Sequence, residues 1–321
     1  MFETGKRPHI TVVGDLILDR YLIGDASKLN PEQPGVIIRV DKEEERLGGA
    51  AAVAMITAGL GARVTLAGVI GRDEHGDRLR GLIDAHGIEP HLWIDGRPTT
   101  WKQRIVTRGQ LRPDRYDREA TTPVGNHAAR FLSTVPLGDM VLISDYGKGV
   151  CTRSLLRSLV NRAHDVNVPI LVDPARSRDW SDYGRVTLIK ANWAEAMEAV
   201  GNHDVRPLTL ARRLSDERNC HVVVTLGRYG LVCAERSGYC WYWPAESVDS
   251  KDVCGAGDTV LAAMAVALAA GQSMWEASRF TVQAAARQVS SIGITTISAT
   301  YPNNPRAVSS PSCFINTCRR F

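Results

Sequence analysis

Four residues in the C-terminal third of the chain combine an anion-binding backbone with a carboxylate. The three residues before Asp258 are Gly255, Ala256 and Gly257. An Ala- and Leu-rich run without internal glycine or proline follows over residues 261–270 and predicts a buried helix. Glycines at a helix start let backbone N–H groups approach an anion such as a phosphate. A carboxylate beside that anion is costly unless it accepts a proton from a hydroxyl that attacks phosphorus, so Asp258 is a candidate base.

The same residues also have a purely structural interpretation. Asp followed by Thr at a helix start is ordinary capping, and Gly-Ala-Gly forms tight turns. A dinucleotide-binding loop is disfavoured because Val260 stands where G-x-G-x-x-G requires its third glycine. Capping and phosphoryl chemistry therefore both remain open for this stretch.

Composition limits the class of protein. The chain has 321 residues, 44% of them hydrophobic, which predicts one α/β domain with a small appendage. A net charge of +4 suits phosphorylated ligands and is too small for a nucleic-acid-binding surface. No apolar run has transmembrane length and residues 1–8 carry no signal-peptide pattern, so we expect a cytoplasmic protein without a membrane or nucleic-acid partner. Seven cysteines with no C-x-x-C pair favour free thiols over zinc ligands or a disulfide framework.

Apolar β-rich runs that end at polar residues alternate with helical patterns along the chain. Three such runs and the residues that follow them are 9–13 with Asp15, 140–144 with Asp145, and 186–191 with Asn192. This alternation predicts a three-layer, doubly wound, mostly parallel sheet. Because ligands bind beyond the carboxyl ends of parallel strands, Asp15, Asp19 and Asp145 are candidate substrate ligands. A turn-capping role is the alternative for Asp15.

Two extended stretches, 90–94 and 101–107, are joined by a turn without an intervening helix. With residues 36–40 they predict a small β-sheet lid, formed from about 36–40 and 90–119. A lid keeps water out of a phosphoryl-transfer site, where water competes with the acceptor hydroxyl. Lys102 and Arg104 lie two apart on one strand, so they face one side and are placed to clamp a substrate phosphate; plain surface charge is the alternative.

Residues 252–260 resemble the C-terminal signature of the ribokinase-like, or PfkB, carbohydrate kinases. Residues 14–21, residues 30–34 and the Gly48-Gly49 pair with the two alanines after it resemble the sugar-binding N-terminal half of that family. The resemblance implies a ribokinase-like fold and one kinase domain over residues 8–298, with 300–321 as a flexible tail. It further implies Asp258 as catalytic base, an anion hole from residues 255–257, and sugar contacts at Gly48 and Gly49.

The resemblance also implies how the nucleotide and metal bind. Asn192 and Glu195 resemble an Asn-x-x-Glu element that organises Mg²⁺ through water, although the same spacing forms a helix-capping box. The residues implied for the nucleotide are Thr225, Gly227, Gly230 and Gln283, the last standing where the family carries Asn. ATP and Mg²⁺ are the expected cofactors, a monovalent cation is left open, and a homodimer paired through the lid is the expected assembly.

Within the family, residues 18–21, 31–34 and 144–149 resemble the branch that phosphorylates heptose 7-phosphate for ADP-heptose and lipopolysaccharide-core synthesis. That kinase occurs as the first half of a bifunctional enzyme, and because this chain is too short for the second half, we expect a separate nucleotidyltransferase to act next. Two departures concern the sugar: Ala52 replaces a sugar-binding Asn, and Ala175 replaces a Lys. Another sugar or nucleoside kinase, a non-catalytic sugar-phosphate sensor and a dehydrogenase of the same sheet class are the alternatives.

Overall fold

The computed structural model describes residues 7–32, 34–107, 110–176, 178–201, 205–249, 254–291 and 294–295. The predicted tail at 300–321 lies outside these ranges. The helices are α1 (Ala50–Gly59), α2 (Glu74–Ala85), α3 (Asn126–Ser133), α4 (Arg153–Asp165), α5 (Trp193–Val200), α6 (Pro207–Arg218), α7 (Ala256–Ala269) and α8 (Met274–Val289). Two short 3₁₀ helices are η1 (Trp180–Tyr183) and η2 (Gly227–Tyr229).

The strands form two sheets. The larger sheet contains β1 (His9–Gly14), β4 (Arg63–Gly71), β5 (Glu89–Asp95), β8 (Met140–Ser144), β9 (Ile170–Asp173), β10 (Leu188–Asn192), β11 (His221–Thr225), β12 (Leu231–Ala234) and β13 (Cys240–Trp243). The smaller sheet contains β2 (Leu16–Leu29), β3 (Val36–Gly49), β6 (Trp101–Thr107) and β7 (Gln110–Arg118). Their strand orders are β13-β12-β11-β10-β9-β8-β1-β4-β5 and β3-β2-β6-β7.

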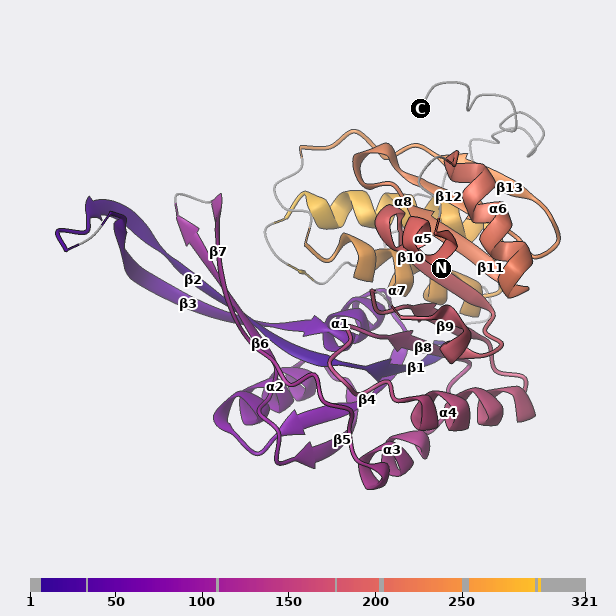
Figure 1. Cartoon of the computed structure of the whole chain (residues 1–321), viewed down its shortest axis with the longest axis horizontal. Helices are drawn as coiled ribbons and strands as arrows, with labels where there is room; N and C mark the ends of the chain where they lie inside the picture. The colour runs from indigo at the N-terminus through magenta and orange to yellow at the C-terminus, as the bar shows by residue number, and fades with distance from the viewer. Residues whose placement is uncertain are drawn as a thin grey trace.

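In the larger sheet, neighbouring strands run parallel through the spatial order β5-β4-β1-β8-β9-β10-β11. The β12–β13 hairpin adds two antiparallel strands at the β11 edge. Alternate strand residues point to opposite faces, so Val12 packs in one hydrophobic cluster and Val13 in the other. Helices α1, α2, α7 and α8 contribute to the first cluster, and α3 to α6 contribute to the second. This arrangement confirms the predicted three-layer fold (Figure 1).

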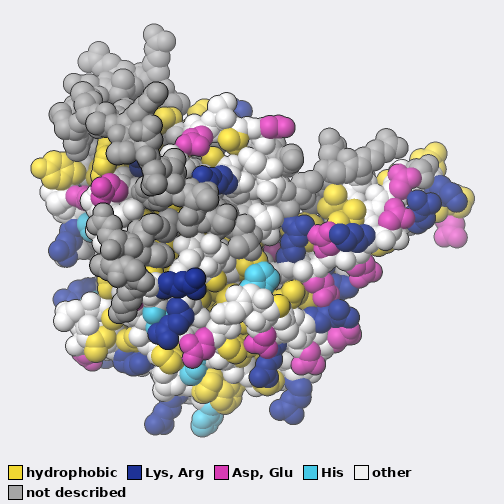
Figure 2. Space-filling model, turned by 180° about the vertical axis from the view of Figure 1, so that it is seen from behind, with side chains coloured by type: hydrophobic (Ala, Val, Ile, Leu, Met, Phe, Trp, Pro, Cys, Tyr) yellow, Lys and Arg dark blue, Asp and Glu magenta, His cyan; other side chains and the backbone are white. Residues whose placement is uncertain are grey.

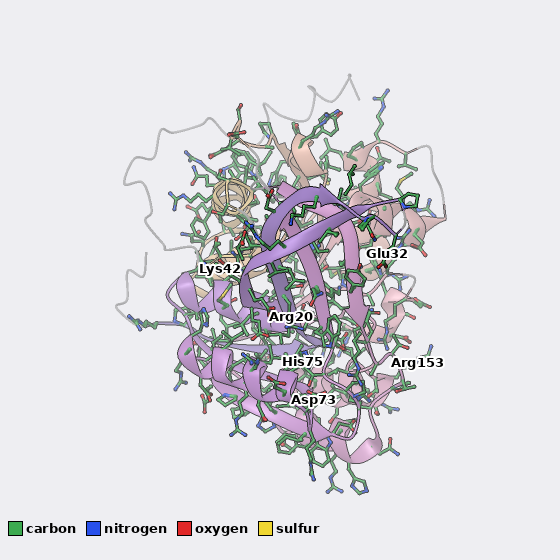
Figure 3. The ribbon with its side chains drawn as sticks, turned by 90° about the vertical axis from the view of Figure 1, so that its left-hand side faces the viewer. Arg20, Glu32, Lys42, Asp73, His75 and Arg153 are labelled. Carbon is green, nitrogen blue, oxygen red and sulfur yellow. The ribbon has the colours of Figure 1, made fainter. Side chains whose placement is uncertain are left out.

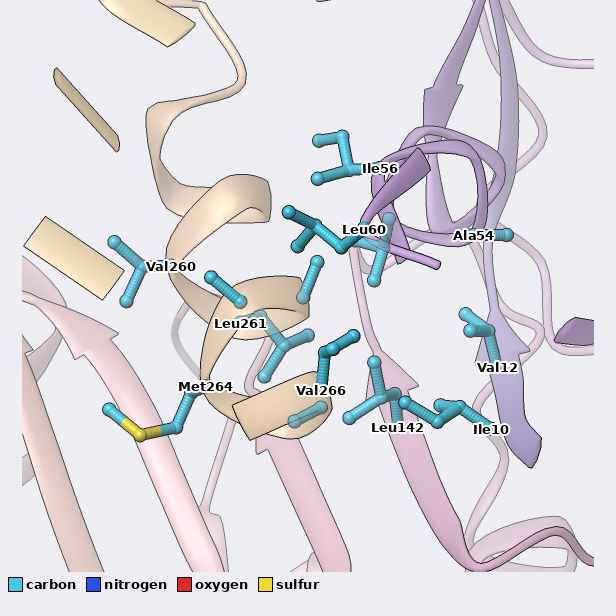
Figure 4. Packing of buried hydrophobic residues seen from close by; sticks show 14 of the residues in the cluster. Ile10, Val12, Ala54, Ile56, Leu60, Leu142, Val260, Leu261, Met264 and Val266 are labelled. Carbon is cyan, nitrogen blue, oxygen red and sulfur yellow. The ribbon is translucent and has the colours of Figure 1, made fainter. Parts of the chain in front are cut away.

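Helix α7 lies at the centre of the first cluster. Every residue from Asp258 to Ala267 is buried, so this helix has no solvent face. Its alanines allow close packing against α1, and Leu261 and Val266 lie in one hydrophobic cluster with Leu142 of β8 and with Leu60, the residue after α1 (Figure 4). This packing fixes the start of α7 at the carboxyl ends of the strands.

The smaller sheet is the lid, and its make-up differs from the prediction. β2 pairs with β3 in antiparallel and with β6 in parallel, which produces a long ribbon that projects from the body of the protein (Figure 1). The glycines and prolines of residues 24–35 predict a loop, and this prediction was wrong for residues 24–29, because β2 continues to Leu29; β3 begins only at Val36. Residues 41–46 of β3 are all charged, so this part of the strand lacks the apolar alternation by which a strand is recognised.

The assignment of residues 90–94 to the lid was also wrong. β5 follows β4 through the connecting helix α2, pairs with β4 in parallel, and forms an edge of the larger sheet. Two consecutive extended stretches resemble a hairpin locally, but here they diverge into different sheets. Only β6 and β7 of the predicted 90–119 segment belong to the lid.

Ion pairs cover the lid surface, and positive and negative side chains alternate along the projecting arm (Figure 2). At its base the Trp101 ring of β6 stacks on His75 of α2 with 5.7 Å between ring centroids. Arg20 of β2 lies over the same indole at 6.0 Å from its centroid. Figure 3 views the lid end-on, with Arg20 close to the α2 residue His75. These contacts attach the lid to the α2 side of the body.

Candidate active site

The start of α7 has the geometry of an anion site. Its N-cap, Gly255, has a φ of 74°, and a Cβ there would lie 2.6 Å from the Ile294 side chain, so both conformation and space require glycine. A Cβ on Gly257 would lie 2.9 Å from Lys190 Nζ. The backbone of this first turn therefore stands directly beside a cation, which adds to the attraction of its N–H groups for an anion.

The Asp258 carboxylate lies in the same first turn and is only 6% exposed. The Tyr146 hydroxyl donates a hydrogen bond of 2.6 Å to Asp258 Oδ1. Burial raises the pKa of Asp258 to about 6, the Tyr146 hydrogen bond and Lys190 oppose this rise, and the Asp173 and Asp19 charges add to it. A carboxylate with a pKa near neutrality is suited to accept a proton.

Lys190 is a site residue that the sequence did not reveal. It lies in β10, where its Nζ forms a 2.7 Å ion pair with Asp173 Oδ2 of β9. Burial acts to lower the pKa of Lys190, but Asp173 more than offsets it, so the ammonium stays charged. Locally Lys190 stands in an apolar strand, and only the β9–β10 pairing brings its carboxylate partner beside it.

Asp19 and its neighbours form a second charged cluster at the base of the lid. Asp19 is 6% exposed, and its Oδ1 has no hydrogen-bond partner among the described residues. A Cβ on Gly48 would lie 2.5 Å from Asp19 Oδ2, so glycine leaves room for the carboxylate. Burial raises the pKa of Asp19, and Arg104 and Lys102 oppose this effect. An unsatisfied buried carboxylate between two cations is a place where substrate hydroxyls can donate.

Asp15 has a different environment from the one expected of a free ligand. Its Oδ2 accepts from the backbone N–H groups of Tyr146 and Lys148, and its Oδ1 accepts from Val150. Its side chain therefore holds the loop after β8, which is the turn-capping alternative. Its backbone carbonyl accepts from Ala50 at the start of α1, and a Cβ on Gly49, whose φ is 57°, would lie 2.4 Å from that oxygen. The Tyr146, Asp15 and Gly49 segments are thus joined by direct contacts.

The Asp145 carboxylate is also committed to the protein interior. Its Oδ1 accepts from Gly147 N–H, and its Oδ2 accepts from Arg178 and the Tyr183 hydroxyl. The side chain is 1% exposed. Asp145 therefore supports the loop that carries Tyr146, and the prediction that it contacts substrate directly has no support in this geometry.

A cavity of about 450 Å³ opens beside the start of α7. Its apolar wall comes from α7 and α8, and its lining includes Val260, Val282, Ala285, Ala286 and Val289. Its polar rim includes Thr225, Gly227, Gly230, Ala256 and Gly257. The predicted nucleotide residues at 225–230 therefore line one cavity with the anion-binding turn. Gln283 does not line it, since the lining positions of α8 form a stripe with helical spacing and residue 283 lies beside that stripe.

Asn192 and Glu195 form the capping box of α5. Asn192 Oδ1 accepts from Glu195 N–H, and Glu195 Oε2 accepts from Asn192 N–H. Burial raises the pKa of Glu195. The described residues contain no group of three or more side chains able to hold a metal ion. The single carboxylate of Glu195 with the Asn192 amide is a donor set compatible with Mg²⁺, because this ion keeps several waters and is held by one or two carboxylates together with substrate phosphates.

A buried carboxylate thus lies at a helix N-terminus, near a largely apolar cavity of about 450 Å³ on one side and the charged Asp19 cluster at the base of the lid on the other. These features define an α/β phosphotransferase site. Residues 7–300 match the family described as pfkB family carbohydrate kinase. The chain belongs to this family and is a sugar kinase.

Relatives with assigned functions agree with the family. The chain is 37% identical over 302 residues to "Bifunctional protein HldE" of Caulobacter vibrioides, covering 90% of this chain and 62% of the relative. It is 36% identical over 303 residues to "D-beta-D-heptose 7-phosphate kinase" of Bordetella bronchiseptica, covering 92% of this chain and 96% of the relative. The chain therefore spans about three fifths of the bifunctional relative and nearly all of the shorter one.

Solved structures share the fold at lower identity. Phosphofructokinase-2 from Escherichia coli, in complex with substrates and products, matches with a TM-score of 0.75 and 21% identity, over 91% of this chain and 96% of that one. Ribokinase from Arabidopsis thaliana, complexed with ribose and ATP, matches with a TM-score of 0.67 and 19% identity, over 90% and 94%. They confirm the ribokinase-like fold. None of the helices in the described ranges has the length and apolar character needed to cross a bilayer.

Proposed function

We propose that this sugar kinase transfers the γ-phosphoryl group of ATP to D-glycero-D-manno-heptose 7-phosphate and forms the 1,7-bisphosphate. The observation that carries the proposal is Asp258, buried in the first turn of α7 and hydrogen-bonded to Tyr146. The relative named D-beta-D-heptose 7-phosphate kinase supports the sugar. On this proposal the product enters ADP-heptose synthesis, where a nucleotidyltransferase acts next.

The proposed chemistry follows from the placement of charge. Asp258 accepts the proton of the sugar hydroxyl while that oxygen bonds to the γ-phosphorus and the bond from phosphorus to the ADP oxygen breaks. N–H groups of residues 255–257 and the Lys190 ammonium stabilise the negative charge on the transferring group. The raised pKa of Asp258 makes it a better base than an exposed aspartate.

The cofactors proposed are ATP and Mg²⁺. The adenine would occupy the apolar part of the cavity near Val282 and Ala286, with its phosphates toward Gly257. Asn192 and Glu195 would hold Mg²⁺ through water, and the ion would neutralise charge on the phosphates.

The sugar would bind between Asp19 and the lid. Asp19 would accept hydrogen bonds from sugar hydroxyls through its unpartnered Oδ1. Lys102 and Arg104, whose charges oppose the rise in the pKa of Asp19 caused by burial, would bind the sugar phosphate from the same strand face.

We also propose that the lid of a second copy covers the exposed apolar residues of the lid ribbon, which are Leu29, Val36, Ile37 and Val40. A solution mass equal to one chain would contradict this.

An ADP-release screen tests the substrate. Purified protein with Mg-ATP is offered heptose 7-phosphate, fructose phosphates, ribose and nucleosides, and we expect heptose 7-phosphate to give the highest kcat/KM. A different preferred acceptor would keep the kinase assignment and reject the heptose. Binding of a sugar phosphate without ADP release from any acceptor would favour the sensor alternative.

Lys190 offers a test of charge stabilisation. Removing it alone would leave Asp173 buried and unpaired, so the test uses the double variant Lys190→Met with Asp173→Asn. We expect kcat to fall by roughly 10- to 100-fold, because one cation beside the transferring phosphoryl group is lost. Lys42→Met, which removes a lid-surface lysine paired with Glu44, serves as control. Wild-type turnover in the double variant would contradict the role.

A further inference from the structure

Tyr146 contacts Asp258 and is held by two further contacts. Its hydroxyl donates to Asp258 Oδ1 at 2.6 Å. Its backbone N–H donates to Asp15 Oδ2 at 2.8 Å, which fixes the start of the loop after β8. Its ring faces Lys102 of lid strand β6, whose Nζ lies 5.6 Å from the ring centroid. The side chain is thus held from the sheet and the lid while it contacts the candidate base.

The hydrogen bond between Tyr146 and Asp258 has a fixed direction. Burial raises the pKa of the Tyr146 phenol well above its usual value, and the Asp258 charge acts in the same sense. The phenol therefore stays protonated over the working pH range and can only donate to the ionised carboxylate. Oδ1 is thereby engaged, whereas Oδ2 accepts no hydrogen bond from the described residues.

We propose that Tyr146 is a positioning residue for Asp258: it holds Oδ1 so that Oδ2 receives the proton of the acceptor hydroxyl. This inference rests on the proposed role of Asp258 as base. When the sugar oxygen bonds to the γ-phosphorus and ADP leaves, its proton moves to Oδ2 while the Tyr146 proton stays on the phenol. A carboxylate without this bond could rotate about χ2 and present either oxygen, so fewer complexes would be aligned for transfer.

The hydroxyl also helps to keep the base ionised. Among the groups around Asp258, the Tyr146 hydrogen bond is the strongest that opposes the rise in its pKa caused by burial. Lys190 acts in the same direction, and Asp173 and Asp19 act against it. Loss of the hydroxyl therefore raises the pKa of Asp258 further. Since the base must be ionised, the acid limb of the kcat profile moves to higher pH.

The test is Tyr146→Phe, which keeps the ring and its contact with Lys102. We expect kcat to fall about tenfold, in line with the loss of one hydrogen bond to a charged group, with the KM for ATP changed less than about twofold. We also expect the acid limb of kcat to shift to higher pH. Unchanged kcat and an unchanged acid limb would overturn the proposal.

A matched control is Tyr183→Phe, which removes another tyrosine hydroxyl bonded to an aspartate, Asp145. This variant should leave the acid limb where it is, and an equal shift in both variants would show a general structural effect and reject the specific one.

A second measurement needs no activity: the NMR titration of ¹³C-labelled aspartate should show a higher pKa for Asp258 in Tyr146→Phe. If that pKa rises while Asp258→Asn keeps normal turnover, the base assignment fails and the contact stands; if the pKa is unmoved, the Tyr146 proposal fails.

Discussion

Replacing Asp258 with asparagine should lower kcat by about 10²- to 10⁴-fold, the range for loss of a general base. Asparagine has nearly the same shape, and its amide oxygen can still accept the Tyr146 hydroxyl, but it cannot take up the proton of the acceptor. The KM for ATP should change little, because the apolar cavity is lined by other residues. Initial rates of ADP release with the preferred acceptor measure the effect. Near-normal turnover would disprove the base assignment.

The same variant should be at least as stable as the wild type at pH 8, which separates loss of chemistry from loss of fold. The pKa of Asp258 is about 6 in the folded protein, above its ordinary value of 3.8, so the folded state holds its charge at a cost above pH 6. Removing that charge should raise the melting temperature at pH 8. The gain should shrink as the pH falls through 6 and vanish below about 4, where the carboxyl is protonated in both states. A lower melting temperature at pH 8 would show that the Asp258 charge supports the fold.

The centre of the site could be predicted from the sequence because its signals are local. The glycines before Asp258 and the apolar run after it predict a buried helix start, and α7 begins at Ala256. Apolar strands that end just before Asp15 and Asp145 and at Asn192 predict the parallel sheet by the same kind of local pattern. Each of these predictions needs only residues that are neighbours in the chain.

The contacts between distant segments could not be predicted in this way. Lys190 is recognisable as part of the site only once β9 places Asp173 beside it. Residues 144–149 stand out in the sequence, but the hydrogen bond from Tyr146 to Asp258 joins residues 112 positions apart. Likewise, the local pattern of residues 90–94 fits either sheet, and pairing with β4 decides it. Asp15 and Asp145 were located correctly at the strand ends, but their hydrogen-bond partners determine whether they can serve a ligand.

Asp15→Ala should cause the largest loss of stability of any change discussed for this site. It removes the carboxylate that accepts from the backbone N–H groups of Tyr146, Lys148 and Val150. Asp15 itself is only 1% exposed. Each unsatisfied buried donor costs about 1–3 kcal/mol, but only the Val150 bond is fully buried and the other two are partly buried. Burial and the Asp145 charge raise the pKa of Asp15 to about 6, so loss of its charge at pH 8 offsets part of this cost, and the expected net loss is roughly 2–4 kcal/mol. This is a large part of the 5–15 kcal/mol that is typical of folded domains.

Urea unfolding of the variant at pH 8, followed by far-UV circular dichroism, measures this loss. Asp84→Ala, which removes an exposed aspartate of α2, should change the free energy of unfolding by less than about 0.5 kcal/mol. Activity should fall together with stability in Asp15→Ala, because the loop held by Asp15 also carries Tyr146 to Asp258. A stable variant with wild-type kcat would show that the loop is held by its other contacts, among them the Gly147 and Asp145 hydrogen bond. A stable variant with an increased KM for the sugar would instead return Asp15 to the role of a direct substrate ligand.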